Sequence, residues 1–172
     1  MKALSMLNDV VSKAIKVILI ILFAAITIVI FMQIVYRYVL LKPIPWAEEV
    51  ARYLFVWISF LGAGVAVKNK SHVGVEFVIN LLPKKATKMA LTFAYLLCGG
   101  FTLLMAYHGW TLVLRTAGQV SAAMRMPMSY AYLAIPVGFL VMTKNFIIIA
   151  CQEVASIRKD SETDKTVDLR GE

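Results

Sequence analysis

Residues 17–35 read VILIILFAAITIVIFMQIV, and only Thr27 and Gln33 in this stretch are polar. A helix needs about 20 apolar residues to cross the hydrocarbon core of a bilayer, so this stretch predicts a transmembrane helix. It is too long to be the core of a signal peptide, and the Tyr-Arg-Tyr that follows lacks the small residues of a cleavage site. We therefore expect the helix to remain part of the protein.

The composition of the whole chain also indicates a membrane protein. Of its 172 residues, 60% are hydrophobic and only 16% are charged, and the mean hydropathy is +0.78. A soluble domain is about half apolar and roughly a quarter charged, so lipid must cover part of this chain. The net charge of +8 does not predict nucleic-acid binding, because the lysines flank apolar segments.

Three further apolar stretches follow, at residues 46–67, 86–114 and 130–151. The sequence therefore predicts an all-α integral membrane protein with four transmembrane helices, in a single domain over residues 1–155. The third stretch is longer than a span requires, so we expect it to tilt or to project from the membrane. Residues 156–172 are polar, and we expect them to form a flexible tail.

The distribution of basic residues predicts the orientation in the membrane. Twelve of the 18 Lys and Arg residues belong to the N-terminus, the 68–88 connection and the C-terminal tail, and five lie near the other span ends. Because cytoplasmic segments carry the excess of Lys and Arg, we expect both termini in the cytoplasm. Residues 72–82 carry apolar side chains at helical spacing before Pro83. They predict a short interfacial helix between the second and third spans.

The densest polar group is Trp46-Ala47-Glu48-Glu49-Val50-Ala51-Arg52-Tyr53, where the second span begins. Glu48 and Arg52 lie one helical turn apart, which predicts an ion pair that lowers the cost of both charges at the membrane edge. The alternative is a cation site or an acid–base pair built on the two carboxylates. No other acid lies in the spans and no HExxH motif occurs, so we expect no catalytic residue, bound metal or cofactor.

Lys144 places a charge inside the fourth predicted span. A charge at the bilayer centre costs at least about 2.5–3.5 kcal/mol, so this residue needs an explanation. Either its long stem carries the ammonium to the cytoplasmic headgroups, or the ammonium makes a polar contact with a partner. Small residues at 62–66 and 99–100 predict close approach of helices. The neighbour in that approach is either this chain or another protein.

The sequence argues against two other classes of membrane protein. A haem or quinone oxidoreductase would need facing histidines or paired cysteines. His72 and His108 lie near opposite span ends, and Cys98 and Cys151 form no CxxC pair. The alternative function is a self-sufficient small transporter that works as a homo-oligomer. Such proteins place a carboxylate in the first span, and residues 17–35 contain none.

Two groups of residues occur together in this sequence. One is W-x-E-E-x-x-R at 46–52, preceded by Arg37 and followed by Trp57, and the other is H-V-x-V-E at 72–76. With them, the sequence resembles the small membrane (Q) subunit of tripartite ATP-independent periplasmic (TRAP) transporters. Glu76 is often aspartate in that family, which is a conservative difference.

The resemblance implies a function. In this family a large membrane subunit moves an organic acid, of the dicarboxylate or sialic acid class, with a sodium gradient. A soluble periplasmic protein delivers the solute to the outer face, and the small subunit braces the large one in the bacterial inner membrane. The resemblance thus implies a protein that is not an enzyme. Its subunit-facing or structural residues would be Arg37, Trp46, Glu48, Glu49, Arg52, Trp57, His72, Glu76 and Lys144.

Overall fold

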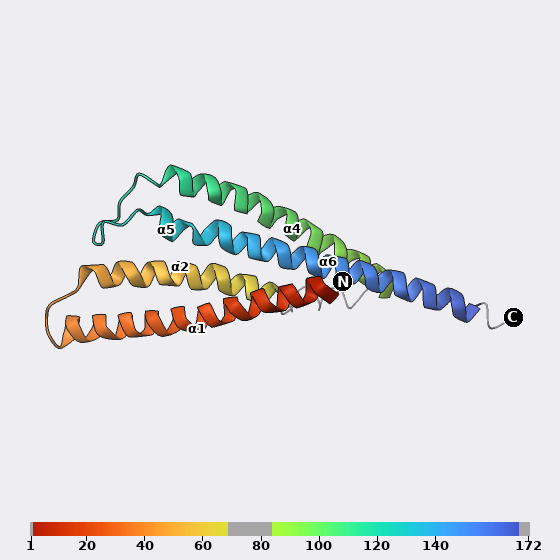
Figure 1. Cartoon of the computed structure of the whole chain (residues 1–172), viewed down its shortest axis with the longest axis horizontal. Coiled ribbons are helices and arrows are strands. Elements are labelled where there is room, and N and C mark those ends of the chain that lie inside the picture. The colour runs from red at the N-terminus through yellow and green to blue at the C-terminus, as the bar shows by residue number, and fades with distance from the viewer. Residues whose placement is uncertain (1, 69–83, 169–172) are drawn as a thin grey trace.

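A computed structural model describes residues 2–68 and 84–168 of the chain, and the side chains of residues 8–68 and 87–155. The described residues fold into helices joined by turns, with one isolated β-bridge. The prediction of an all-α protein is confirmed (Figure 1). The helices are α1 (Lys2–Tyr38), α2 (Pro45–Lys68), α4 (Lys84–Arg115), the short α5 (Ser129–Tyr132) and α6 (Ala134–Asp168).

Four segments of these helices are long and apolar enough to cross a membrane, which confirms the four predicted spans. They are Asn8–Tyr38, Pro45–Lys68, Thr87–Arg115 and Ser129–Ala155. The helix that holds the first span begins well before residue 17, because residues 2–16 contain neither glycine nor proline to break it. It ends beside Leu41, whose φ of 53° is left-handed. Proline then occupies the first position of α2, where no backbone N–H is needed.

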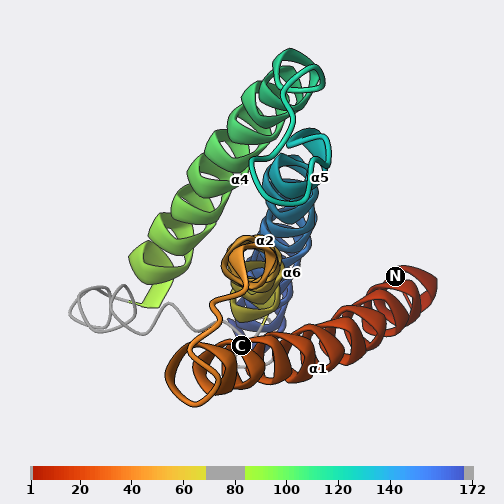
Figure 2. The same ribbon diagram turned by 90° about the vertical axis from the view of Figure 1, so that its left-hand side faces the viewer.

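The four long helices form an open row instead of a closed bundle. Among the described helices, α1 packs closely against α2, α2 against α6, and α6 against α4, while α5 joins the end of α4 to α6. The end-on view in Figure 2 shows this order. Half of the most apolar window of Ser129–Ala155 is buried inside the chain, whereas none of the window in Asn8–Tyr38 is. The α6 helix is therefore the centre of the fold, and α1 is its edge.

Small residues let α2 and α6 approach closely. A Cβ atom added to Gly64 would lie 2.6 Å from Cγ1 of Val141, and one added to Gly138 would lie 2.5 Å from Cβ of Phe60. Gly62 and Gly100 have nothing within 4 Å of such an atom. The small residues at 62–66 predicted the close approach of a neighbouring helix. At Gly64 that neighbour is α6 of the same chain.

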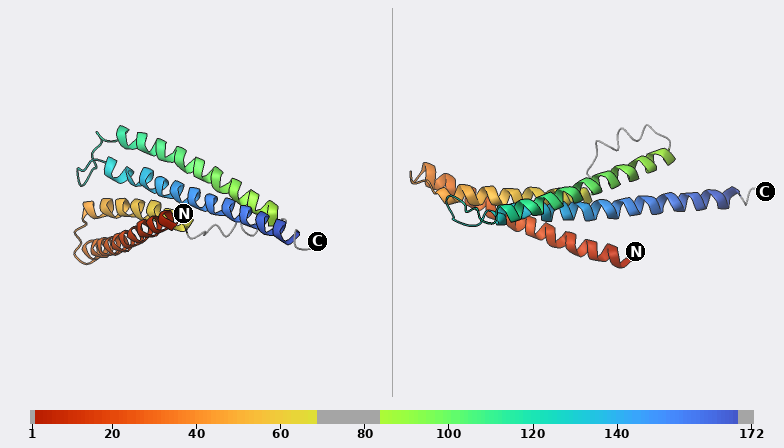
Figure 3. Two further views of the ribbon diagram at one scale, coloured as in Figure 1. Left: turned by 45° about the vertical axis from the view of Figure 1, so that its right-hand side comes forward. Right: turned by 90° about the horizontal axis from the view of Figure 1, so that it is seen from above.

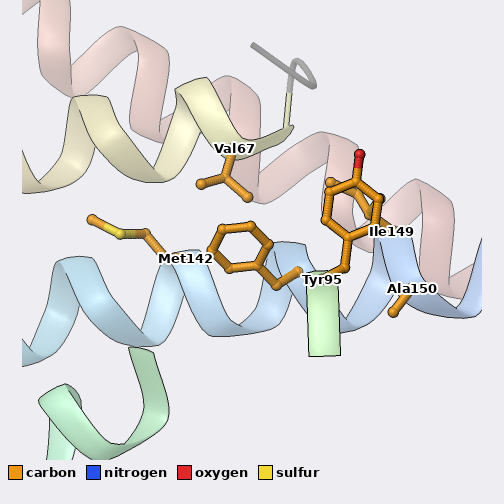
Figure 4. Packing of buried hydrophobic residues seen from close by; sticks show 6 residues of the cluster. Val67, Tyr95, Met142, Ile149 and Ala150 are labelled. Atoms are coloured by element: carbon orange, nitrogen blue, oxygen red, sulfur yellow. The ribbon is translucent and has the colours of Figure 1, made fainter. Parts of the chain in front are cut away.

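Polar bonds and a small core complete the contacts of α6. Asn145 donates from Nδ2 to the carbonyl oxygen of Gly64 over 2.8 Å, and Thr143 donates to Oγ1 of Thr102 over 2.8 Å. Lipid tails are as apolar as leucine, so tight packing and such hydrogen bonds hold membrane helices together. Figure 4 shows the core at this level, where side chains of α2, α4 and α6 meet. Its buried members are Val67, Tyr95, Met142, Phe146, Ile149 and Ala150.

The two termini point toward the same end of the molecule (Figures 1 and 3). We call this the terminal end. The opposite end carries the connections 39–44 and 116–128, and we call it the loop end. The predicted interfacial helix at 72–82 lies outside the described residues. The α6 helix continues to Asp168, while the flexibility expected of residues 156–172 and the cytoplasmic location of both termini stay predictions.

Candidate functional site

Most of the predicted contact residues lie at one end of the row. Arg37, Trp46, Glu48, Glu49 and Arg52 lie near the loop end. Lys144 lies apart from them, in the first third of α6, and lines a cavity with Asn8 of α1. The H-V-x-V-E group with His72 and Glu76 lies outside the described residues.

Glu48 joins the first turn of α2 to the last turn of α1. Its Oε1 lies 3.7 Å from Nη1 of Arg37 and accepts a hydrogen bond from Nε2 of Gln33 over 3.1 Å. The predicted pair with Arg52 is wrong: no ion pair joins the two side chains in the described part of the chain. The antiparallel neighbour α1 brings its own cation and amide to Glu48, whereas Arg52 stays exposed. Both members of the Arg37–Glu48 pair are 56% exposed.

Glu49 is buried and fastens the 116–128 connection to α2. Its Oε2 accepts hydrogen bonds from the backbone N–H of Ala123, over 2.9 Å, and of Met124, over 3.1 Å. The hydroxyl of Tyr53, one helical turn away, donates to Oε1. Only 8% of Glu49 is exposed. A carboxylate held by three donors can remain charged in such a place.

The connection that Glu49 holds has its own internal structure. Ser121 donates its backbone N–H to the carbonyl of Met126 over 2.9 Å, and Met128 donates to Gln119 over 2.9 Å. Between them Arg125 takes a left-handed φ of 53°. The connection is therefore a short folded hairpin, and the carboxylate of Glu49 binds its tip to α2.

The two tryptophans of α2 have different surroundings. Nε1 of Trp57 donates to the carbonyl oxygen of Tyr130 over 3.2 Å and so links α2 to α5. Trp46 is 42% exposed at the start of α2. Aromatic rings at span ends favour the membrane interface, which suits this position.

Lys144 is half-buried, and it lines a cavity between α1 and α6 together with Asn8 and Val11. No carboxylate pairs with it in the part of the chain that the structure describes. Nearby, Nζ of Lys68 contacts Oδ1 of Asp9 over 2.8 Å and ties α2 to α1. Both explanations offered for Lys144, an ammonium that reaches the headgroups and a polar contact with a partner, stay predictions.

Some polar contacts could not be found from the sequence. The partners of Glu49 are backbone amides, which carry no side-chain signature, although Tyr53 four residues on was a usable hint. Asn8 and Ser12 precede the predicted first span, yet both are buried. Their spacing of one helical turn was the available signal.

The surface of the described helices includes an apolar groove. On one face an open groove of about 940 Å³ runs between α2 and α4, with α6 as its floor. Its walls include Ala66, Leu97 and Phe101, and its lining is almost entirely apolar. Among the described residues no group of three His, Cys, Asp or Glu side chains gathers where it could hold a metal. The described geometry therefore offers surfaces for helices or lipid.

Several known proteins are similar in sequence to this chain. The family model described as "Tripartite ATP-independent periplasmic transporters, DctQ component" matches residues 26–156. The sialic acid TRAP transporter small permease protein SiaQ of Vibrio cholerae is 33% identical over 108 residues, covering 61% of this chain and 62% of that protein. The C4-dicarboxylate small permease protein DctQ of the same species is 27% identical over 152 residues, covering 74% and 66%.

A third relative is much longer. The sialic acid TRAP transporter permease protein SiaT of Haemophilus influenzae is 33% identical over 126 residues, which make up 73% of this chain but 20% of that protein. The chain thus spans less than two thirds of the length of each of these three relatives. Because the family model covers most of the sequence, the resemblance to the small subunit of TRAP transporters is confirmed. The chain belongs to the DctQ family, the small permease subunits of TRAP transporters.

Proposed function

We propose that this chain is the accessory permease subunit of a sodium-driven importer of an organic acid, and that it braces the scaffold of a large transport subunit. The observation that carries the proposal is the open row of helices. A row leaves apolar surface on both faces and along α1, where Phe23, Ile28 and Phe31 are each more than 60% exposed. Such surface suits a neighbouring membrane protein as well as lipid.

The polar groups of the spans support a structural role. Asn145, Thr143 and Thr102 bond to neighbouring helices, and Glu49 bonds to the hairpin at the loop end. A transporter that works alone places polar groups where they line a solute path near mid-membrane. Here the groove between α2 and α4 has an apolar lining. The solute path is therefore assigned to the large subunit.

The large partner has support from the relatives. Proteins of this family work with a large permease subunit, and in SiaT the similar region is one fifth of a longer permease. In the proposal the two proteins form a heterodimer in the bacterial inner membrane, with both termini of this chain in the cytoplasm. The solute class, a dicarboxylate or sialic acid, follows the names of DctQ and SiaQ.

A soluble periplasmic protein would then dock at the loop end. The basic side chains there are exposed, namely Arg37, Lys42, Arg52, Arg115 and Arg125. The two carboxylates of this end, Glu48 and Glu49, are already bonded within the chain. The excess of positive charge would steer an acidic surface of the soluble protein toward this end.

Reconstitution tests the proposal. The chain, a large permease from the same genome and the soluble binding protein are placed together in liposomes, and uptake of sialic acid and of a C4-dicarboxylate is followed with and without a sodium gradient. We expect uptake only when all three proteins and sodium are present. Uptake that persists without this chain, or that this chain supports alone, would contradict the proposal.

A further inference from the structure

The turn that follows α1 exposes a run of large apolar side chains at the loop end. Four consecutive residues are exposed by half or more: Tyr38 (71%), Val39 (72%), Leu40 (50%) and Leu41 (80%). The next residue, Lys42, is exposed as well. A contiguous exposed apolar patch marks a surface that binds another protein or a membrane.

The backbone fixes the position of this run. The N–H of Lys42 donates to the carbonyl oxygen of Tyr36 over 3.0 Å, so the chain folds back against the last turn of α1. Leu41 makes this bend with its φ of 53°, the left-handed conformation that glycine usually supplies where a helix ends. A bulky side chain is strained and uncommon in that conformation. A strained residue with an exposed apolar side chain indicates that the side chain itself is used.

The turn lies at the level of the lipid headgroups. The apolar stretch of α1 ends at Val35, and the helix rises about 4.5 Å from there to Tyr38. The headgroup region adds about 5–7 Å on each side of the hydrocarbon core. Because the chain turns back at Leu41, the run stays within this layer. A water-soluble protein would have to displace headgroups to reach it, so the occupant is the bilayer or another membrane protein.

The directions of the side chains distinguish these two occupants. Successive residues of a helix point about 100° apart, so Tyr38, Val39 and Leu40 together face about half of the circumference at the end of α1. A protein neighbour packs against one side of a helix and would leave part of this run uncovered. Lipid surrounds every side that α2 leaves open. The exposed cation of Lys42 beside the leucines also suits lipid, because phosphates lie at the same level.

We propose that residues 38–42 form an interfacial anchor in the leaflet at the loop end. Leu40 and Leu41 insert among the lipids, and Lys42 lies against their phosphates. The anchor sets the depth of α1, the edge helix, whose most apolar window has no residue buried inside the chain. It depends on neither the solute nor the large permease, so it stands apart from the proposed function.

Fluorescence quenching in lipid nanodiscs tests the anchor. In the full chain Cys98 and Cys151 are replaced by alanine, and a cysteine introduced by Leu41→Cys is labelled with bimane. The quenchers are lipids with a nitroxide near the headgroup, lipids with a nitroxide near the end of the acyl chain, and aqueous iodide. We expect the shallow nitroxide to quench most, and iodide to quench far less than it quenches free bimane, with and without the large permease. Ile28→Cys, which is exposed near the middle of the first span, is the matched control, and the deep nitroxide should quench it most.

A second variant tests the leucine side chain, with bimane at Val39→Cys. Burial of one leucine favours the inserted state by about tenfold or more, so Leu41→Lys should raise iodide quenching at residue 39 several-fold. Gln119→Lys adds the same charge at an exposed position of the hairpin and should leave that quenching unchanged. The proposal is overturned if iodide quenches residue 41 as strongly as free bimane, if the large permease abolishes quenching by lipid, or if Leu41→Lys has no effect at residue 39.

Discussion

One methyl group added at Gly138 should push α2 and α6 apart. A Cβ atom there would lie 2.5 Å from Cβ of Phe60, 2.9 Å from its carbonyl oxygen and 3.0 Å from its carbonyl carbon. Two of these three atoms belong to the backbone, so a rotation of the phenyl ring cannot relieve the contact. The Gly138→Ala variant must therefore move one helix against the other. That movement would also disturb the packing of Gly64 against Val141.

The size of the effect follows from two opposing terms. Overpacking of a well-filled contact costs about 1–3 kcal/mol, whereas alanine in place of glycine within a helix recovers about 0.5–1 kcal/mol. The free energy of unfolding should fall by about 1–2 kcal/mol, which is roughly a tenfold change in the folding equilibrium. Gly100→Ala is the matched control, because a Cβ at Gly100 meets nothing within 4 Å. It should be neutral or stabilising.

Unfolding by SDS in mixed micelles measures both variants, with helix content followed by circular dichroism and the environment of the three tryptophans by fluorescence. The difference between Gly138→Ala and Gly100→Ala is the quantity of interest, since both make the same chemical change in a helix. If the two variants unfold at the same SDS concentration, α2 and α6 do not meet at Gly138 as described, and the central position of α6 loses its main support.

Three further variants probe the polar contacts. Glu49→Gln should speed hydrogen exchange at the two hairpin amides that bind its carboxylate, whereas Glu48→Gln should leave them unchanged; equal exchange would count against the hairpin contact. Asn145→Leu removes an interhelical hydrogen bond, so SDS unfolding should register a loss of about 0.6 kcal/mol, and not more than about 1.7. Arg37→Ala breaks an exposed pair, so its effect should stay below about 1 kcal/mol and should shrink in high salt.

The spans were predictable because their signal is local. Residues 17–35 need only about 20 consecutive apolar side chains to identify a transmembrane helix. The order of the helices in the row has no such signal. An apolar side chain such as Phe31, which faces outward, and one such as Phe146, which is buried, satisfy the same hydropathy rule. In lipid, apolarity does not distinguish the inside of a protein from its outside.

Local sequence spacing also fails to identify which residue pairs with a charged side chain. Glu48 has a cation four residues away in sequence and another across the helix pair, and local spacing favours the first. The structure selects the second, because α1 also brings Gln33 to the same carboxylate oxygen. Similarly, Gly62 and Gly64 belong to one small-residue stretch, but only Gly64 meets another helix closely. The rotation of a helix about its axis decides which of these residues makes the contact. A single sequence does not determine that rotation.

The attachment of α1 differs from that of the other helices. Its only buried apolar residues within the described side chains are Ile15 and Ile26, and polar contacts to α2 lie near its two ends, at Glu48 and at Lys68. The inner helices, by contrast, are joined by close glycine contacts and buried hydrogen bonds around α6. Exchanging lipid for a protein neighbour along α1 would therefore leave the contacts of α2, α6 and α4 intact. A chain built in this way can present a broad apolar edge to a partner without relying on that partner to hold its own centre together.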